Sequence, residues 1–280
     1  MSRAGPIDGG GLPVAPAAKS GGEKSGSRPG YFEHSRTPLV SLAFVLPLVI
    51  IYEVGTGLGR WSGAGSGSAQ RAPQHIIAFT LLQQFFSLFG ATGQHLPAMA
   101  LAGILIAWHV ARRDPWKIRW TALGGIAAEA VLLSIPLIAM GIALAHLFRA
   151  VPLAAAPAQS AVSGLPPREL MVLCLGAGIY EELVFRLIIL TVLSLVIKDL
   201  LLFPAKMTGL TVVLLSAVMF SAYHYLGSEA FHWHAVASWR TFAFRTLAGI
   251  YFGVLFLTRG FGVTAATHAA YDILVLLALP

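Results

Sequence analysis

The chain has 280 residues, of which 56% are hydrophobic and 11% are charged, and its formal net charge is +7. An average soluble domain carries about 25% charged residues, so this composition excludes an ordinary soluble domain. Several apolar segments of about 18 residues or more follow one another, which is typical of a protein that crosses a membrane several times. The positive charge does not indicate a nucleic-acid partner, because the Lys and Arg residues of membrane proteins collect in cytoplasmic loops and tails. The single cysteine, Cys174, excludes an intrachain disulfide and a multi-cysteine metal site.

The chain begins with a segment that lacks the apolar residues of a core. Residues 1–36 are basic and rich in Gly, Pro, Ser and Ala, so they are predicted to form a disordered tail. A first membrane span is predicted over 39–54. The apolar stretch 75–89 is short and contains Gln83 and Gln84, so it either crosses the membrane or lies in the interface. We favour a segment that does not cross.

The remaining chain alternates between apolar spans and polar loops. Further spans are predicted over 96–110, 120–147, 170–197, 210–226, 242–257 and 263–279. The loop 112–119 contains four basic residues and is therefore the best candidate for a cytoplasmic loop. Glu129, inside a span, is predicted to pair with a basic residue of the core helices. Together these features predict an all-α, polytopic transmembrane helical bundle of seven or eight helical segments, with residues 37–280 as one membrane domain.

Three ionisable residues lie close together in the span 170–197. Such residues are costly within a membrane, and they normally face the interior of a bundle or a watery cavity. Glu182 and Arg186 are four positions apart, so they lie on one helix face and are predicted to pair. Glu181 lies about 100° round the helix and is free to point elsewhere. A purely structural ion pair that locks two helices together is the alternative for Glu182 and Arg186.

Two later spans contribute histidines with helical partners. Phe220 and His224 are four positions apart, as are His268 and Asp272, so an aromatic ring lies beside one histidine and a carboxylate beside the other. An acid, two histidines and an arginine in a desolvated pocket are the groups needed to activate water and to stabilise an oxyanion. Taken alone, His224 near the end of a span has an equally simple interpretation as an interfacial histidine.

These motifs, on three separate helices and in this order, resemble those of one protein family. Glu-Glu-x-x-x-Arg (Glu181, Glu182, Arg186), Phe-x-x-x-His (Phe220, His224) and His-x-x-x-Asp (His268, Asp272) are similar to the motifs of the CPBP family. Its members are CAAX prenyl proteases and bacteriocin-processing intramembrane proteases, also called the Abi or lysostaphin-resistance-like family. The resemblance covers about 168–280. It implies an endopeptidase that cuts a peptide or protein substrate near the membrane surface, with membrane lipid as its other partner.

The resemblance also implies roles for individual residues. In a glutamate-protease mechanism, Glu181 and His224 activate water, whereas Glu182 and Arg186 support the pocket and Arg186 is also a candidate anchor for substrate. An older interpretation of the family makes these residues metal ligands. Glu181, His224 and His268 would then hold Zn²⁺ with one open position. The sequence does not distinguish the two mechanisms.

The last motif departs from the pattern of the CAAX proteases, which usually have Asn where this chain has Asp272. His268 and residue 272 are implied to stabilise the oxyanion, but an ionised carboxylate only accepts hydrogen bonds. Asp272 would therefore have to be protonated in order to donate. We favour the alternative, in which Asp272 accepts a hydrogen bond from the ring N–H of His268 and orients it.

Two other functions are compatible with polar residues in membrane spans. A proton-coupled transporter is one, because relays of Glu, His and Arg occur in such proteins. A non-catalytic immunity or assembly protein of the same fold is the other. The His-Glu-x-x-His motif of site-2-type metalloproteases is absent from the sequence. The expected location is a multi-pass position in the inner (plasma) membrane of a bacterium.

Overall fold

The computed structural model describes residues 30–63, 76–148, 165–202, 204–226 and 231–278, and within these ranges all regular structure is helical. This confirms the predicted all-α class. The α-helices are α1 (Tyr31–Ser35), α2 (Pro38–Gly63), α3 (Ile77–Ser87), α4 (Leu96–Arg112), α5 (Trp120–Leu147), α7 (Pro167–Gly176), α8 (Thr191–Leu195), α9 (Ala205–Tyr223), α10 (Val236–Arg259) and α11 (Phe261–Ala278).

Helices α7 and α8 are parts of one continuous helix, residues 167–200, which we call the glutamate helix. Its backbone is π-helical at Ala177–Glu181, Leu183–Leu190 and Val196–Leu200. Such wider turns are rare and occur frequently at functional sites. When the glutamate helix is counted once and the five-residue α1 is left out, the described chain forms eight helices, the larger of the two predicted numbers.

Four helices of the described chain are long and apolar enough to cross a membrane. They are Pro38–Leu58, Trp120–Leu147, Met207–Leu226 and Val236–Arg259, and each coincides with a predicted span. Helix α3 has 11 residues. At 1.5 Å per residue it is about 16 Å long, roughly half the thickness of the hydrocarbon core. Helix α3 is therefore too short to cross, in agreement with our interpretation of the stretch 75–89.

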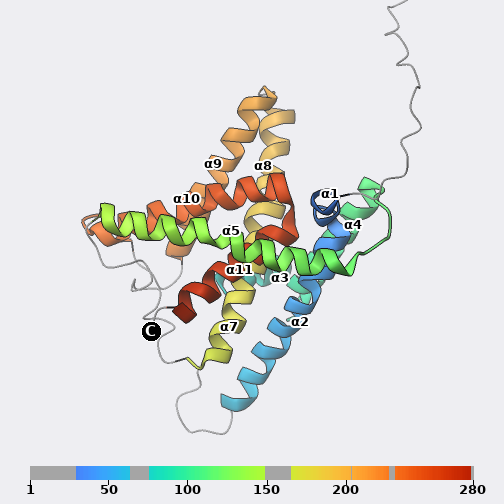
Figure 1. Cartoon of the computed structure of the whole chain (residues 1–280), viewed down its shortest axis with the longest axis horizontal. Helices are drawn as coiled ribbons and strands as arrows, with labels where there is room; N and C mark the ends of the chain where they lie inside the picture. The colour runs from blue at the N-terminus through green and yellow to red at the C-terminus, as the bar shows by residue number, and fades with distance from the viewer. Residues whose placement is uncertain (1–29, 64–75, 149–164, 203, 227–230, 279–280) are drawn as a thin grey trace, which may run out of the picture.

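Helix α11 lies at the centre of the bundle, where it packs against α2, α5, α10 and the glutamate helix (Figure 1). Residues 260–269 are all buried. The glutamate helix crosses α11 closely at Gly178, where an added Cβ would lie 2.7 Å from the backbone oxygen of Ala265 and 2.7 Å from the backbone nitrogen of Ala269. Small residues at such crossings let two backbones approach. The middle of the glutamate helix is thereby brought within side-chain reach of the middle of α11.

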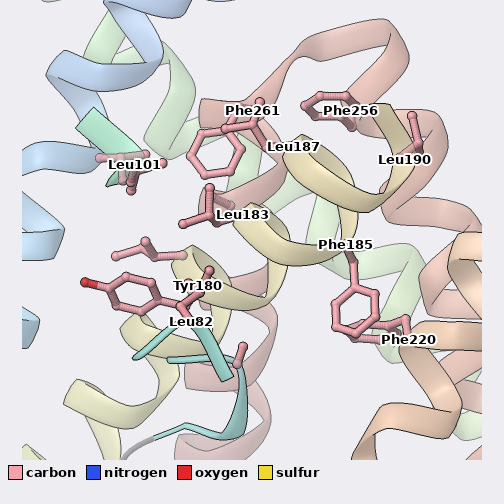
Figure 2. Packing of buried hydrophobic residues seen from close by; sticks show 14 of the residues in the cluster. Leu82, Leu101, Tyr180, Leu183, Phe185, Leu187, Leu190, Phe220, Phe256 and Phe261 are labelled. Atoms are coloured by element: carbon pink, nitrogen blue, oxygen red, sulfur yellow. The ribbon is translucent and has the colours of Figure 1, made fainter. Parts of the chain in front are cut away.

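Apolar side chains of several helices fill the space around the glutamate helix (Figure 2). Leu183 is fully buried there, and the ring of Phe185 meets that of Phe220 of α9 edge to face, with centroids 5.3 Å apart. Helix α9 also packs on α10, where an added Cβ at Gly249 would lie 2.8 Å from Cα of Ala217. These contacts fix the position of α9, which ends just before His224.

Helix α1 lies within the stretch that was predicted to be a disordered tail, and residues 1–29 of that stretch are outside the described residues. The Nε2 atom of His34 in α1 accepts a hydrogen bond of 3.1 Å from the backbone N–H of Arg119. Both His34 and Ser35 are buried. The end of this stretch carries aromatic and polar side chains, which the Gly- and Pro-rich average composition conceals.

Hydrogen bonds to Glu129 of α5 connect α1 to the bundle. Its carboxylate accepts hydrogen bonds of 2.6 and 2.7 Å from Arg259 of α10 and one of 2.6 Å from the hydroxyl of Tyr31. The prediction that Glu129 pairs with a basic residue of the core helices is therefore confirmed. The neutralised pair explains how this carboxylate is accommodated inside a span.

Contacts between the helices show toward which end of the bundle His224 lies. The contacts of α1 place Arg259 at the same end as the basic loop 112–119. Helices α9 and α10 are antiparallel, and the hydroxyl of Ser221 near the end of α9 donates to the backbone oxygen of Phe242 near the start of α10. His224 therefore lies toward the end opposite to Arg259. If the basic loop is cytoplasmic, as predicted, His224 lies nearer the other face of the membrane.

Candidate active site

The six polar residues predicted for a site come from three parts of the fold and meet in the bundle interior. They are Glu181, Glu182 and Arg186 of the glutamate helix, His224 just after α9, and His268 and Asp272 of α11. Each lies within 4.0 Å of at least one other member, so the structure brings all six together. Glu182 and Arg186 have no solvent exposure, and Glu181 is 6% exposed.

Glu181 lies between the two histidines. Its Oε2 atom is 3.8 Å from Nε2 of His224 and 3.9 Å from Nε2 of His268. These distances are too long for direct hydrogen bonds and are of the size that a bridging water molecule spans. The other oxygen, Oε1, accepts a hydrogen bond of 3.1 Å from the hydroxyl of Tyr223. One carboxylate oxygen is therefore held by the protein, and the other faces both imidazole rings.

The Nε2 atom of His224 faces Glu181 and is an acceptor for a water molecule between them. Its Nδ1 atom lies 2.7 Å from the backbone oxygen of Phe220. Because a carbonyl oxygen only accepts, Nδ1 carries the hydrogen and Nε2 of the neutral ring has a free lone pair. The rings of Phe220 and His224 also meet edge to face, with centroids 4.9 Å apart. Phe220 therefore sets both the orientation and the tautomer of the histidine.

Glu182 orients His268 from a neighbouring helix. The Nδ1 atom of His268 lies 2.8 Å from Oε1 of Glu182. An ionised carboxylate only accepts, so Nδ1 is the donor. The ring of Phe252 stacks on the imidazole, with centroids 4.6 Å apart and an interplanar angle of 20°. With one face and one nitrogen held in this way, Nε2 of His268 points toward Glu181.

Asp272 does not have the contact that we expected. The hydrogen bond from the ring of His268 goes to Glu182, whereas Oδ2 of Asp272 lies 3.7 Å from Nε2, which is too long for a hydrogen bond. Its side chain is 26% exposed, more than that of any other member of the group. The four-residue spacing makes the two side chains neighbours on α11, but it does not decide which carboxylate the ring nitrogen reaches. The geometry thus gives the orienting contact to Glu182.

Arg186 is an ion-pair partner enclosed by aromatic rings. Its Nε atom lies 3.0 Å from Oε2 of Glu182, which confirms the pair predicted from their spacing. Its guanidinium donates to the backbone oxygen of Gly249 at 3.2 Å and lies 4.5 Å from the ring centroid of Phe220 and 5.4 Å from that of Phe252. These cation–π contacts help to stabilise the buried charge. Without solvent exposure, Arg186 fits a supporting role better than that of a substrate anchor.

Sequence reasoning missed two residues of this site. Tyr223 donates to Glu181, and Phe252 covers the ring of His268. Tyr223 could have been found, because a tyrosine inside a span needs a partner for its hydroxyl and this one adjoins a candidate histidine. Phe252 carries no such signal, since a phenylalanine in an apolar helix packs equally well against lipid or another helix.

The donor atoms of the site are of a kind that zinc accepts, namely imidazole nitrogens and a carboxylate. Ligand distances of 2.0–2.2 Å would place neighbouring donors about 3.3–3.6 Å apart around a tetrahedral ion. Oε2 of Glu181 is 3.8 and 3.9 Å from the two imidazole nitrogens. Within the described ranges, no group of three or more His, Cys, Asp and Glu residues is arranged to hold a metal ion. In this arrangement the described side chains do not form a metal site.

The fold and the site together define a class, a polytopic helical membrane protein with a glutamate and two histidines gathered in its interior. Residues 164–274 match a family model described as type II CAAX prenyl endopeptidase Rce1-like. The match confirms the resemblance to the CPBP family of CAAX prenyl proteases for this segment, which contains all six site residues. Comparisons with curated proteins and with solved structures gave no match. The segment 164–274 is therefore similar to the type II CAAX prenyl endopeptidases.

Proposed function

We propose that the protein is an intramembrane endopeptidase that hydrolyses a membrane-proximal peptide bond with water activated by Glu181 and His224. The position of Glu181 Oε2, 3.8 Å from Nε2 of His224 and 3.9 Å from Nε2 of His268, carries the proposal. A carboxylate and an unprotonated imidazole nitrogen that face one point can bind a water molecule and remove its proton. The family match supports peptide hydrolysis as the reaction.

The reaction has two proton transfers, both at Glu181. Glu181 first takes a proton from a water molecule that also donates to Nε2 of His224, and the water oxygen attacks the carbonyl carbon of the scissile bond. The carbonyl π electrons move to its oxygen, which becomes the oxyanion of a tetrahedral intermediate. The carbonyl then re-forms as the C–N bond breaks, and the proton on Glu181 passes to the leaving nitrogen. The products are a new carboxyl end and a new amino end.

His268 is assigned to the oxyanion. Because its Nδ1 donates to Glu182, Nε2 can donate to an oxyanion only when the ring is protonated on both nitrogens. The carboxylates of Glu181, Glu182 and Asp272 lie within 4.0 Å of the imidazole nitrogens and stabilise the positive ring electrostatically. Asp272 therefore contributes charge and Glu182 contributes orientation.

The test is cleavage by the purified protein in liposomes. Two peptides with the same membrane-proximal site, one prenylated and one not, would be followed by mass spectrometry. Glu181→Ala and His224→Ala should abolish cleavage and leave thermal unfolding unchanged within a few degrees. Glu169→Gln, which changes a partly exposed acid at the start of the same helix, is the matched control and should cleave normally. Equal turnover by wild type and Glu181→Ala would refute the mechanism.

The same liposomes separate this proposal from a proton-coupled transporter. A peptidase yields two fragments whether or not a proton gradient is present. A transporter would move protons with its substrate and leave the peptide intact, because its polar relay binds and releases protons without breaking a covalent bond. Two measurements therefore decide between the functions: the fluorescence of a pH-sensitive dye inside the liposomes and the mass spectrum of the peptide products.

A further inference from the structure

We infer that Tyr223 is a positioning residue, which holds Glu181 in its working orientation and joins it to α3. This inference rests on the proposed function of Glu181. Tyr223 is 4% exposed, and its hydroxyl donates to Oε1 of Glu181 at 3.1 Å. The hydroxyl oxygen of Tyr223 in turn accepts a hydrogen bond of 3.1 Å from the backbone N–H of Ala78. One hydroxyl therefore makes two contacts, one with the glutamate and one with a separate helix.

The direction of both hydrogen bonds follows from the chemistry of the partners. A backbone N–H can only donate, so the hydroxyl oxygen must accept from Ala78. The hydroxyl proton is then left for Glu181, whose ionised oxygens can only accept. The donor is consequently aimed at the carboxylate before any substrate arrives. It stabilises the ionised form of Glu181, which is the form that removes a proton from water.

The contact with Ala78 explains how α3 is fixed. Ala78 is the second residue of α3, where a helix leaves its backbone N–H groups without internal partners. The hydroxyl of Tyr223 supplies one such partner. The next residue, Phe79, packs its ring against that of Tyr180, with centroids 4.9 Å apart. The first turn of the helix that does not cross the membrane is thus anchored beside the glutamate helix by a hydrogen bond to Tyr223 and an aromatic contact.

The ring of Tyr223 is held independently of its hydroxyl. It meets the ring of His224 edge to face at 4.7 Å and that of Phe185 at 4.9 Å, centroid to centroid. A phenylalanine at this position keeps these contacts and removes the oxygen alone. Tyr223→Phe therefore tests the hydroxyl without opening a large cavity.

Other charged groups also face Glu181, and their effects must be separated from that of the hydroxyl. His224 approaches from the end of α9, while His268 and Asp272 approach from α11. Glu182 is its neighbour on the glutamate helix, and farther out Arg245 of α10 lies over the ring of Tyr225. Tyr223→Phe leaves the formal charge of all these groups unchanged, so a change in the acidic limb of the pH–rate profile reports the lost donor.

The experiment compares the pH profiles of cleavage for wild type, Tyr223→Phe and Tyr251→Phe. The control removes a hydroxyl that donates to the backbone oxygen of Leu133 and not to a member of the site. For Tyr223→Phe we expect a roughly tenfold lower kcat, little change in KM and an acidic limb about one pH unit higher, since a hydrogen bond to a charged group is lost. Tyr251→Phe should have the wild-type profile.

A second variant tests the inference if Tyr223→Phe does not fold. Replacement of Tyr223 by 3-fluorotyrosine gives a more acidic phenol and a stronger donor with nearly the same shape. It should move the acidic limb to lower pH. An active wild-type protein whose profile is the same with tyrosine, phenylalanine or fluorotyrosine at position 223 would overturn the inference and leave the proposed function intact. A wild-type protein that cleaves neither peptide would instead contradict the proposed function.

Discussion

Replacing Glu182 with leucine would leave two buried polar groups without their partner. Its Oε2 atom lies 3.0 Å from Nε of Arg186 and its Oε1 atom lies 2.8 Å from Nδ1 of His268, and both charged side chains of the pair are 0% exposed. Removing one member of a buried ion pair costs roughly 3–5 kcal/mol, because the remaining charge stays desolvated. This corresponds to a fall in the unfolding midpoint on the order of 10 °C.

A double variant separates the effect of an unpaired buried charge on stability from the effect of a changed side-chain shape. In Glu182→Leu with Arg186→Met, both charges are replaced by apolar groups of similar volume, and such replacements are often neutral or stabilising. The N–H of His268 still loses its acceptor, which costs about 1–3 kcal/mol. The double variant should therefore be more stable than the single one. Both should be inactive, because Nδ1 of His268 then has no acceptor to orient the ring and only the stacking of Phe252 remains.

Thermal unfolding in detergent and peptide cleavage in liposomes measure the two effects. The control is Asp114→Asn, which removes the negative charge from a 2.8 Å contact with Arg112; the side chains of this pair are 42% exposed for Arg112 and 19% for Asp114. Exposed ion pairs contribute about 0–1 kcal/mol, so this variant should resemble wild type. Wild-type stability in Glu182→Leu would refute the buried ion pair. Full activity in either Glu182 variant would refute the orientation of His268 by Glu182.

Three further predictions concern charge, pH and metal. Asp272→Asn should lower kcat/KM about tenfold and move the basic limb of the pH–rate profile to lower pH, because the imidazolium of His268 loses a stabilising charge; a variant more active than wild type would show that residue 272 acts as a donor. Burial and the positive charge of Arg119 lower the pKa of His34 from its ordinary value of 6.5. The native state then binds fewer protons than the unfolded state, so attachment of α1 is fully present above about pH 6.5 and weakens as the pH falls below it. Hydrogen exchange of residues 31–36 would measure this, and His34→Gln should remove the pH dependence. Finally, cleavage should survive treatment with a strong chelator; a loss that added Zn²⁺ reverses would assign the site to a metal-dependent mechanism.

Much of the site could be predicted because its residues have helical spacing inside apolar spans. Glu182 and Arg186 pair as expected, since residues four apart are neighbours even where the helix widens to π-helical turns. Spacing within one helix does not predict contacts between different helices. From that spacing we expected Asp272 to be the partner of the His268 ring, whereas Glu182 approaches the ring from another helix and makes the shorter contact.

The N-terminal segment shows a second limit of prediction from the sequence. Averaged composition marks residues 1–36 as a tail, yet Tyr31 and His34 form specific hydrogen bonds with the bundle. A few side chains at the end of a polar segment are enough to attach it when a buried carboxylate such as Glu129 needs partners. Composition averages over a window and cannot register such individual contacts.

The sequence by itself determined that the chain is a helical membrane protein and which polar residues must face inward, and four of its predicted spans, 39–54, 120–147, 210–226 and 242–257, overlap helices long enough to cross a membrane. Hydropathy and the cost of placing charge in lipid are properties of each segment and need no knowledge of its neighbours. Only the tertiary structure decided which inward-facing groups touch. Those contacts depend on how the helices cross and rotate, which is set by close approaches such as that of Gly178 to α11 and by the packing of Phe252 on His268.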